Sequence, residues 1–265
     1  MNVIVCVKQV PDPEKAAEVR IDEETYTLKR EGIQAVINPF DMYAIEEGLR
    51  IRERYGGKVT AISMGPPQAE EALRETLALG VDEAVLISSR AFAGSDTLAT
   101  SYALSKGIER IGSYDLIICG KQASDGDTAQ VGPGIAERLG IPFLAWVRKV
   151  EWIENGVMRA QRLMEDGYEV IDLPIPALIT VVKEINEPRL PSLRGKMKAK
   201  RAEIPVWNED DIGADRSRIG LEGSPTKVIR IFTPEKRKRG EIIHPDDPEE
   251  AASFLAEKLR EMNVA

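Results

Sequence analysis

The chain has 265 residues and a formal net charge of −8 at pH 7, with 43% hydrophobic and 30% charged residues. These proportions are typical of a soluble globular protein made of one large domain, or of one domain with appendages. The negative charge argues against nucleic-acid binding, and no apolar run approaches the roughly 20 residues that span a bilayer.

The few cysteines and histidines narrow the chemistry further. Cys6 and Cys119 both lie in apolar, strand-like runs, so we expect buried, reduced thiols and a cytoplasmic protein. The first residues run directly into an expected strand, without the basic region and cleavage site of a signal peptide. With one histidine and no paired cysteines, no metal site is expected.

Apolar runs alternate with helical patterns over the first two thirds of the chain. The expected strands are Val3–Val7, Lys58–Met64, Ala84–Ser88 and Leu116–Cys119. The expected helices are Asp41–Tyr55, Gln68–Leu79, a helix from Thr97 to Ile111 capped by Ser95 or Asp96, and Gly134–Leu139. This alternation predicts a doubly wound α/β fold, in which a mostly parallel sheet carries helices on both faces.

The most informative segment is the polar loop 119–133, which joins an expected buried strand to the helix that begins at Gly134. The unpaired amides and the dipole of a helix start favour negative charge, and ligands of such sheets bind at the carboxyl ends of the strands. Gly126, Gly132 and Gly134 would let the backbone approach a ligand closely. Walker A and Gly-x-Gly-x-x-Gly spacings are both missing, so the loop alone predicts only an anion near a helix start.

Two further polar helix starts, Asn38–Asp41 and Gly94–Thr97, are expected at the same edge of the sheet. Together the three would suit a ligand with several phosphate and ribose oxygens, although each could simply cap its own helix. The hydroxyls of Thr97, Thr100 and Thr128 can donate hydrogen bonds to a phosphate. The carboxylates of loop 119–133, by contrast, are expected to cap the helix, bind ribose hydroxyls or accept loop amides.

The last third of the chain has a different pattern. Val147–Ile153 and Val157–Leu163 predict a hairpin across an Asn-Gly turn, and Ala177–Val182 predicts a core strand. Asn186–Lys198 predicts an irregular surface loop, because it combines two prolines, a glycine and many cations. Beyond it we expect an extended arm over Pro205–Gly240. A terminal amphipathic helix follows, capped by Asp246 or Asp247, that packs on a partner subunit or back on its own domain.

Six motifs together resemble the beta subunit of electron-transfer flavoprotein, over roughly residues 1–235. They are Val5–Asp12, Asn38–Asp41, Ser63–Pro66, Gly120–Pro133, Asn186–Arg189 and Lys196–Lys200. The resemblance implies a Rossmann-like, adenine-nucleotide-binding fold and a heterodimer with an alpha subunit that carries an FAD. It implies no catalytic side chain, because the cofactors supply the redox chemistry.

The resemblance also implies a cofactor site at the edge described above. The expected cofactor contacts are Cys6, Asn38, Pro39, Phe40, Asp41, Met64, Gly65, Asp96, Thr97, Thr100, Gln122, Ala123, Ser124, Asp125, Gly126, Asp127, Thr128, Ala129, Gln130, Val131, Gly132 and Pro133.

Within the family, the chain is similar to the electron-bifurcating type in Gly94–Thr100, Asp125–Gln130 and Arg194–Val206. That similarity implies FAD in this subunit and NAD(H) as electron donor. Electrons would pass through the alpha-subunit FAD to an acyl-CoA dehydrogenase or a quinone oxidoreductase complex, and to ferredoxin or flavodoxin. The alternative is a non-bifurcating carrier that binds structural AMP. A nucleotide-hydrolysing or adenylate-transferring enzyme of similar topology is disfavoured, since no glycine-rich triphosphate loop stands out.

The segment 181–203 resembles the family's partner-recognition loop, in which a leucine anchors into a dehydrogenase. The expected partner contacts are Leu193, Arg194, Lys196 and Met197, unless Leu193 is tucked under its own loop. We therefore expect a nucleotide-binding domain over 1–205, and an arm and helix over 206–265 that pack on the alpha subunit. The expected location is the cytoplasm, with access to the inner membrane surface through a partner.

Overall fold

The computed structural model describes residues 1–18, 20–21, 28–29, 35–229, 240, 242 and 247–263. The chain forms two compact units, Met1–Arg230 and Ile231–Ala265. The first unit extends past residue 205, where we expected the nucleotide-binding domain to end. The beginning of the arm belongs to it, because Val206 and Trp207 pair in parallel with a strand of the main sheet.

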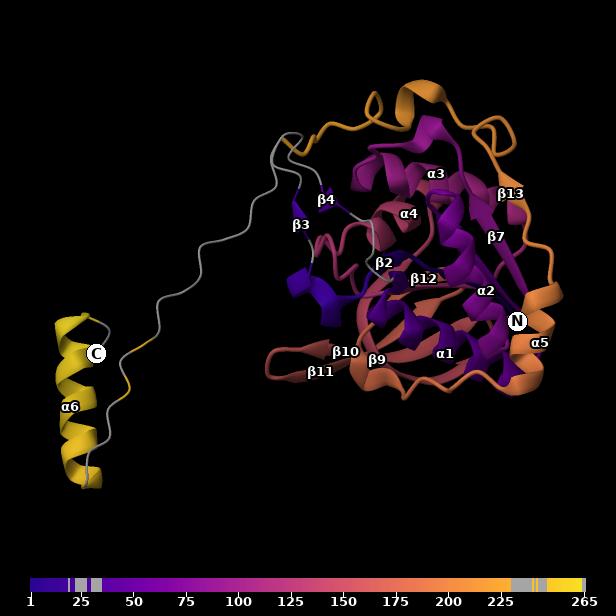
Figure 1. The fold of residues 1–265 in the computed structure, drawn as a ribbon. Helices are drawn as coiled ribbons and strands as arrows, with labels where there is room; N and C mark the ends of the chain where they lie inside the picture. Colours follow the sequence, from indigo (N-terminus) through magenta and orange to yellow (C-terminus); the bar gives the residue numbers. More distant parts are fainter. Residues whose placement is uncertain are drawn as a thin grey trace. The chain divides into compact units, whose positions relative to one another are not determined.

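Nine strands of the described residues form one sheet, in the order β11-β10-β9-β12-β8-β1-β6-β7-β13. Their bounds are β1 Asn2–Cys6, β6 Lys58–Met64, β7 Glu83–Ile87, β8 Leu116–Gly120, β9 Phe143–Glu154, β10 Val157–Met164, β11 Gly167–Pro174, β12 Ala177–Val181 and β13 Val206–Trp207. In this sheet order, every neighbouring pair along β9-β12-β8-β1-β6-β7-β13 is parallel. The two pairs at the other end, β9–β10 and β10–β11, are antiparallel. The mostly parallel sheet is confirmed (Figure 1).

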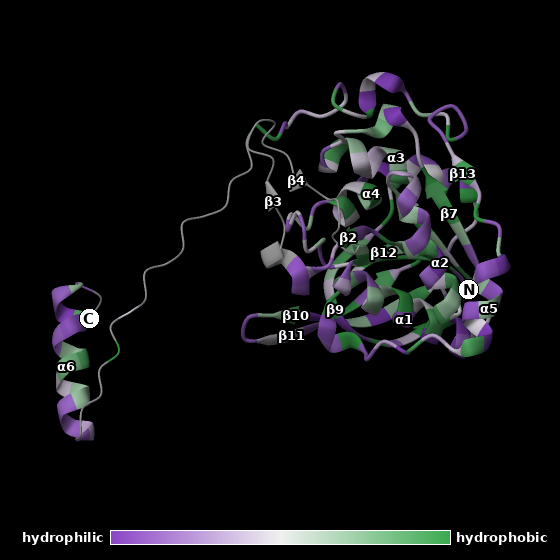
Figure 2. Cartoon of the chain, in the orientation of Figure 1, coloured by the Kyte–Doolittle hydropathy of each residue, from purple (hydrophilic) through white to green (hydrophobic). Residues whose placement is uncertain are grey.

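Helices cover both faces of this sheet. Alternate residues of β1 point to opposite faces, as in any strand: Val3 and Val5 join one hydrophobic cluster, and Ile4 and Cys6 join the other. The first cluster contains residues of α1 (Pro39–Tyr55) and α2 (Glu70–Leu79), and the second contains residues of α3 (Thr97–Ile111) and α4 (Val131–Leu139). The doubly wound prediction is therefore confirmed. In Figure 2 the sheet strand β7 is hydrophobic, whereas a later helix, α5 (Leu193–Arg201), is mostly hydrophilic.

The remaining elements are short or lie in the last third. Two small antiparallel sheets pair β2 (Gln9–Pro11) with β5 (Ala35–Ile37), and β3 (Arg20–Ile21) with β4 (Leu28–Lys29). The described part of the chain also forms short 3₁₀ helices: η1 Pro13–Glu18, η2 Pro67–Ala69, η3 Arg90–Phe92, η4 Lys183–Ile185 and η5 Arg216–Arg218.

Three details differ from the sequence-based expectation. α4 begins at Val131 rather than Gly134, since a first-turn proline loses no helical hydrogen bond. The predicted hairpin forms, but a further strand, β11, extends it; its residues are mostly exposed, so it carried no alternating apolar signal. The expected irregular loop contains a helix, α5 (Leu193–Arg201), because the Ser192 side chain caps its start and lysine and arginine favour helices.

The second unit contains α6 (Pro248–Glu261). Asp247 caps it, accepting a hydrogen bond from the Glu249 amide at 3.1 Å, which settles the choice between Asp246 and Asp247. Leu255 and Met262 of the expected apolar stripe are 60% and 68% exposed. The expected contact of this helix with the alpha subunit remains a prediction.

Candidate functional site

A cavity of about 350 Å³ lies at the carboxyl ends of β1, β6 and β8, beside the starts of α1, α3 and α4. Its volume is within the range of small-molecule sites. Most of the expected cofactor contacts line it: Cys6, Asn38, Asp41, Met64, Asp96, Thr97, Thr100, Gln122, Ala123, Gly126, Thr128, Ala129, Gln130, Val131 and Gly132. Residues from five separate parts of the sequence are thus brought to one cavity.

Seven expected contacts do not line this cavity: Pro39, Phe40, Gly65, Ser124, Asp125, Asp127 and Pro133. Seven residues outside the expected set do line it: Val7, Lys8, Ser95, Leu104, Cys119, Gly120 and Lys121. Sheet register could have found one of them, because Cys119 pairs with Cys6 in the parallel ladder of β8 and β1. Leu104 lies one turn beyond Thr100 on α3, so helical spacing places both on one face.

Asn38 connects two walls of the cavity and does not use its side chain to cap α1. Its side-chain Nδ2 donates to the Gln122 carbonyl at 2.8 Å, and its Oδ1 accepts from the Ser124 amide at 3.0 Å. Asn38 is only 1% exposed, so both bonds are shielded from water. The helix-cap alternative is therefore wrong for this side chain, whose role is to hold the loop that follows β8.

Asp41 connects the same helix to the end of β1. Its Oδ2 accepts a hydrogen bond from the Lys8 amide at 2.8 Å. Burial raises the pKa of Asp41 to about 7, although hydrogen bonds from Lys8, Asn38 and Gly120 oppose that rise. The cavity floor therefore contains a carboxyl group that titrates near neutral pH.

The loop after β8 turns its two carboxylates toward protein groups. Asp125 forms an ion pair with Lys8, with 2.6 Å between Nζ and Oδ1, and Asp127 accepts a hydrogen bond from the Gln122 side-chain amide. Asp127 and Ala129 both adopt left-handed backbone conformations, with φ of 55°. Thr128 lies between them and lines the cavity. Of the three roles that the sequence left open for these carboxylates, Asp127 takes the acceptance of a loop amide, here from the side chain of Gln122.

Two of the three loop glycines serve packing between protein segments. A methyl group on Gly132 would lie 2.7 Å from Thr180 Cγ2 on β12, and one on Gly134 would lie 2.8 Å from Ser101 Oγ on α3. Only Gly126 faces open space. Packing therefore already accounts for the missing side chains of Gly132 and Gly134, which let α4 pack against the sheet and its neighbouring helix, and their approach to a ligand stays a prediction.

The starts of α3 and α4 differ. Asp96 caps α3, accepting from the Leu98 and Ala99 amides at 3.0 and 3.1 Å, and its other oxygen accepts from Thr226 of the arm. The start of α4 has no side-chain cap. Its first amides are therefore available to a negatively charged ligand, whereas α3 offers the cavity mainly the hydroxyl of Thr100, because the Thr97 hydroxyl donates to Gln130 Oε1 at 2.8 Å.

The two cysteines lie side by side on the cavity floor. Both are free and buried, which confirms the expected buried, reduced thiols. The hydrogen bond with Cys6 and burial raise the pKa of the Cys119 thiol. This raised pKa keeps the Cys119 thiol protonated and unreactive, so it fills space in the floor.

The partner contacts expected from the sequence lie on α5. Leu193 is 78% exposed and Met197 is 56% exposed, so Leu193 is not tucked under its own loop. Together with Arg194, they line a shallow depression on the outer face of α5, while Lys196 lies exposed beside it. The helix presents an apolar pair surrounded by cations.

The described residues contain neither a cluster of metal ligands nor a membrane-spanning helix. Within them, no group of three histidine, cysteine or acidic side chains is placed to hold a metal ion. No helix in the same part of the chain is both long and apolar enough to cross a membrane.

Comparison with known proteins identifies the family. The electron transfer flavoprotein domain matches residues 25–212. The chain is 52% identical to the electron transfer flavoprotein subunit beta of Thermoanaerobacterium thermosaccharolyticum over all of both chains. It is 47% identical to the caffeyl-CoA reductase-Etf complex subunit CarD of Acetobacterium woodii, again over all of both chains. It is 45% identical to protein FixA of Azotobacter vinelandii, over 98% of this chain and 94% of the relative. The chain belongs to the electron transfer flavoprotein family, as a beta subunit that functions in electron transfer beside an alpha subunit.

Proposed function

We propose that this chain binds FAD in the cavity and takes part in NADH-dependent electron bifurcation. Electrons pass through the alpha-subunit FAD to an acyl-CoA dehydrogenase or a quinone oxidoreductase complex, and to ferredoxin or flavodoxin. The extent of the cavity carries this proposal. It reaches from Cys6 and Asn38 past the start of α4 to Thr97 and Thr100 on α3, so one long ligand can contact both helix starts.

The groups that line the cavity fit a dinucleotide with two phosphates. The uncapped start of α4 and the hydroxyls of Thr100 and Thr128 are hydrogen-bond donors, while the Thr97 hydroxyl donates to Gln130 Oε1. The side chain of Lys121 adds positive charge at the same cavity, where Lys8 is paired with Asp125. A bound FAD would supply the redox chemistry, while these residues would bind and orient it.

The structure also contains groups that keep negative charge away from the phosphates. Asp96 is used by the α3 cap and by the arm, and Asp125 is neutralised by Lys8. Neither carboxylate is a free neighbour of the ligand, which supports an anionic ligand over a cationic one.

We further propose that α5 is the docking surface for the electron-exchange partner. Leu193 and Met197 form its apolar centre, and Arg194 and Lys196 form its charged rim. The relative from Acetobacterium woodii is named as a subunit of a caffeyl-CoA reductase complex. That name supports a dehydrogenase of CoA esters as the partner, and a cytoplasmic location that reaches the inner membrane only through a quinone-reducing partner. The arm and α6 would pack on the alpha subunit.

The second candidate is a carrier subunit that holds structural AMP. One observation favours it: the cavity volume of about 350 Å³ is near the lower end of the range for small-molecule sites. AMP would use the start of α4 and leave Thr97 and Thr100 without a ligand contact.

Cofactor counting distinguishes the two. The heterodimer is co-produced and denatured, and the released FAD and AMP are quantified per dimer. We expect two FAD molecules, of which one in the native complex is reduced directly by NADH. One FAD and one AMP per dimer would overturn the bifurcation proposal and support the second candidate.

A further inference from the structure

We propose that Arg189 is a positioning residue for partner docking: by joining Glu46 and Glu53 of α1, it holds the exposed face of α5 in place without touching the partner. This inference rests on the proposed docking role of α5. Arg189 lies four residues before Leu193, and only three residues separate it from the first turn of the docking helix.

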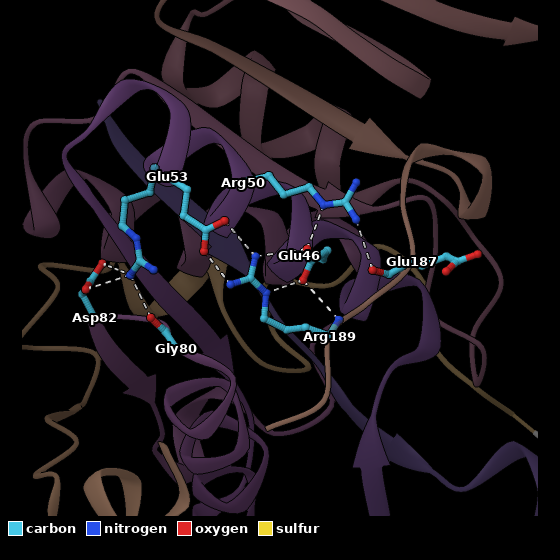
Figure 3. Close-up of polar contacts among 8 residues, drawn as sticks. Glu46, Arg50, Glu53, Gly80, Asp82, Glu187 and Arg189 are labelled. Atoms are coloured by element: carbon cyan, nitrogen blue, oxygen red, sulfur yellow. Dashed lines mark hydrogen bonds and ion pairs between the residues drawn. The ribbon is translucent and has the colours of Figure 1, made fainter. Parts of the chain in front are cut away.

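The contacts of Arg189 are unusually numerous for one side chain. Its Nε donates to Glu46 Oε2 at 2.7 Å, its Nη2 donates to both glutamates at 3.1 Å, and its Nη1 donates to Glu53. Its backbone amide also donates to Glu46 Oε2 at 3.2 Å. Figure 3 shows the guanidinium between the two carboxylates. Paired charged donors of this kind fix both the direction and the distance of a segment.

The acceptors on α1 are themselves held. Glu46 and Glu53 are seven residues apart and therefore share one face of the helix, with Arg50 between them. The Glu46 side chain is only 5% exposed and accepts a further bond from Arg50 at 2.8 Å. Burial would raise the pKa of Glu46, but the hydrogen bonds from Arg189 and Arg50 outweigh it and lower that pKa. Glu46 therefore stays ionised, and its bonds to Arg189 are charge-assisted.

The chain leading to Arg189 lies along the same helix. The Asn186 side chain donates to the Tyr43 carbonyl and to Glu47, both at 3.0 Å, and Arg50 also reaches the Glu187 carbonyl. This whole segment is thus fixed to α1 up to Arg189. After Arg189 the contacts with α1 end: Leu190 is 89% exposed.

α5 is also anchored to α2, near its start and at its far end. Ala199 is buried, Arg74 of α2 donates to the carbonyls of Ala199 and Ala202, and a methyl group on Gly195 would lie 2.2 Å from the Ala78 carbonyl oxygen. α2 therefore holds the inner face of α5. Arg189 is the last fixed point before Leu193, so it sets where the apolar pair begins.

The test compares variants of the complete heterodimer. Arg189→Met removes the charged donors and keeps a long apolar side chain, and Arg189→Lys keeps only the charge. Arg159→Met is the matched control, because it breaks an exposed two-bond pair with Asp172 on the β10–β11 hairpin, away from α5. The double variant Arg189→Met with Glu46→Gln avoids a buried, unpaired carboxylate should the single variant fold poorly.

The first readout is amide hydrogen exchange over residues 190–201. We expect Arg189→Met to speed exchange there roughly tenfold, with partial recovery in Arg189→Lys and no change in Arg159→Met. Unchanged exchange in both Arg189→Met and the double variant would overturn the inference, because α2 alone would then hold the helix.

The second readout is the KM for a purified acyl-CoA dehydrogenase. We expect a roughly tenfold rise in KM with unchanged kcat and FAD content, since docking is weakened and the electron-transfer step is not. Faster exchange with an unchanged KM, measured where Leu193→Ala does raise KM, would refute the docking role of Arg189. If Leu193→Ala leaves KM unchanged as well, the α5 docking surface itself is wrong, and the exchange data alone decide whether Arg189 positions the helix.

Discussion

The cavity and the docking helix are built in opposite ways. At the cavity, Asn38 and Asp41 are buried, and each holds two segments together while it lines the site. On α5, Leu193 and Met197 are exposed and support nothing inside the protein. The difference teaches that cavity residues combine stability with binding, whereas docking residues affect binding alone.

The largest expected effect is the pH dependence of Asp41. The carboxyl group of Asp41 loses its proton near its ordinary pKa of 3.8 in the unfolded chain, but near pH 7 in the folded protein. The folded state therefore gains stability from this proton, fully below pH 4, and loses that gain as pH rises to 7. Relative to Asp41→Asn, the native protein should lose about 4 kcal/mol of unfolding free energy across this window, as an upper bound.

The measurement is the melting temperature of both proteins at intervals from pH 5 to pH 8.5. The melting temperature of the native protein should fall relative to that of Asp41→Asn as the pH rises to about 7, and above that pH the two curves should run parallel. Parallel curves over the whole range would mean that Asp41 is already ionised at pH 5.

The next effect in size concerns Asn38. Asn38→Ala leaves the Gln122 carbonyl and the Ser124 amide without their buried partners, so we expect a loss of about 3 kcal/mol in unfolding free energy. Nucleotide retention should fall together with stability, because the loop lines the cavity. Chemical denaturation and dialysis measure the two losses. Asn38→Asp is a second variant: it keeps the acceptor for Ser124 but replaces the donor to Gln122 with a buried carboxyl oxygen, so it should also be destabilised.

Leu193 tests the other side of the comparison. Leu193→Ala should weaken docking to an acyl-CoA dehydrogenase by about 2 kcal/mol, as for an apolar residue at the centre of an interface. The melting temperature and FAD content should stay unchanged, because the side chain is 78% exposed. Titration of the dehydrogenase measures docking. Val170→Ala, at another exposed apolar position, is the control, and an equal effect there would argue against a specific anchor.

Sequence patterns predicted the sheet, its covering helices and the edge that carries the cavity, because these follow from local apolar periodicity. They also brought Cys6, Asn38 and Thr128 to one site. They did not predict α5, since its start depends on the Ser192 side chain and its burial on contacts with α2. Nor could they tell that Asp125 pairs with Lys8, because that depends on how the loop folds back toward the end of β1.

The role of Gly132 and Gly134 shows the same limit. Their spacing beside a polar loop indicated close approach of a ligand, but packing against Thr180 and Ser101 needs the same absence of a side chain. A short sequence cannot separate these two reasons, since both are met by a missing Cβ. The distinction comes from elements distant in sequence, which only the folded chain brings together.

The smallest expected effect concerns Thr128 and separates two kinds of cavity residue, those that also stabilise the fold and those that only bind. Thr128 lines the cavity yet is exposed and has no hydrogen bond that stabilises the loop in the described structure. Thr128→Val should therefore behave like a docking residue: it removes one hydroxyl donor and lowers nucleotide affinity by about 1 kcal/mol, roughly fivefold, with no change in melting temperature. Thr128→Ser keeps the donor and should retain nucleotide as the native protein does. The amount of nucleotide retained after dialysis measures the affinity of both variants. If Thr128→Val instead lowers the melting temperature of the nucleotide-free protein, as Asn38→Ala should, the loop is a structural unit throughout and the cavity has no residue that serves binding alone.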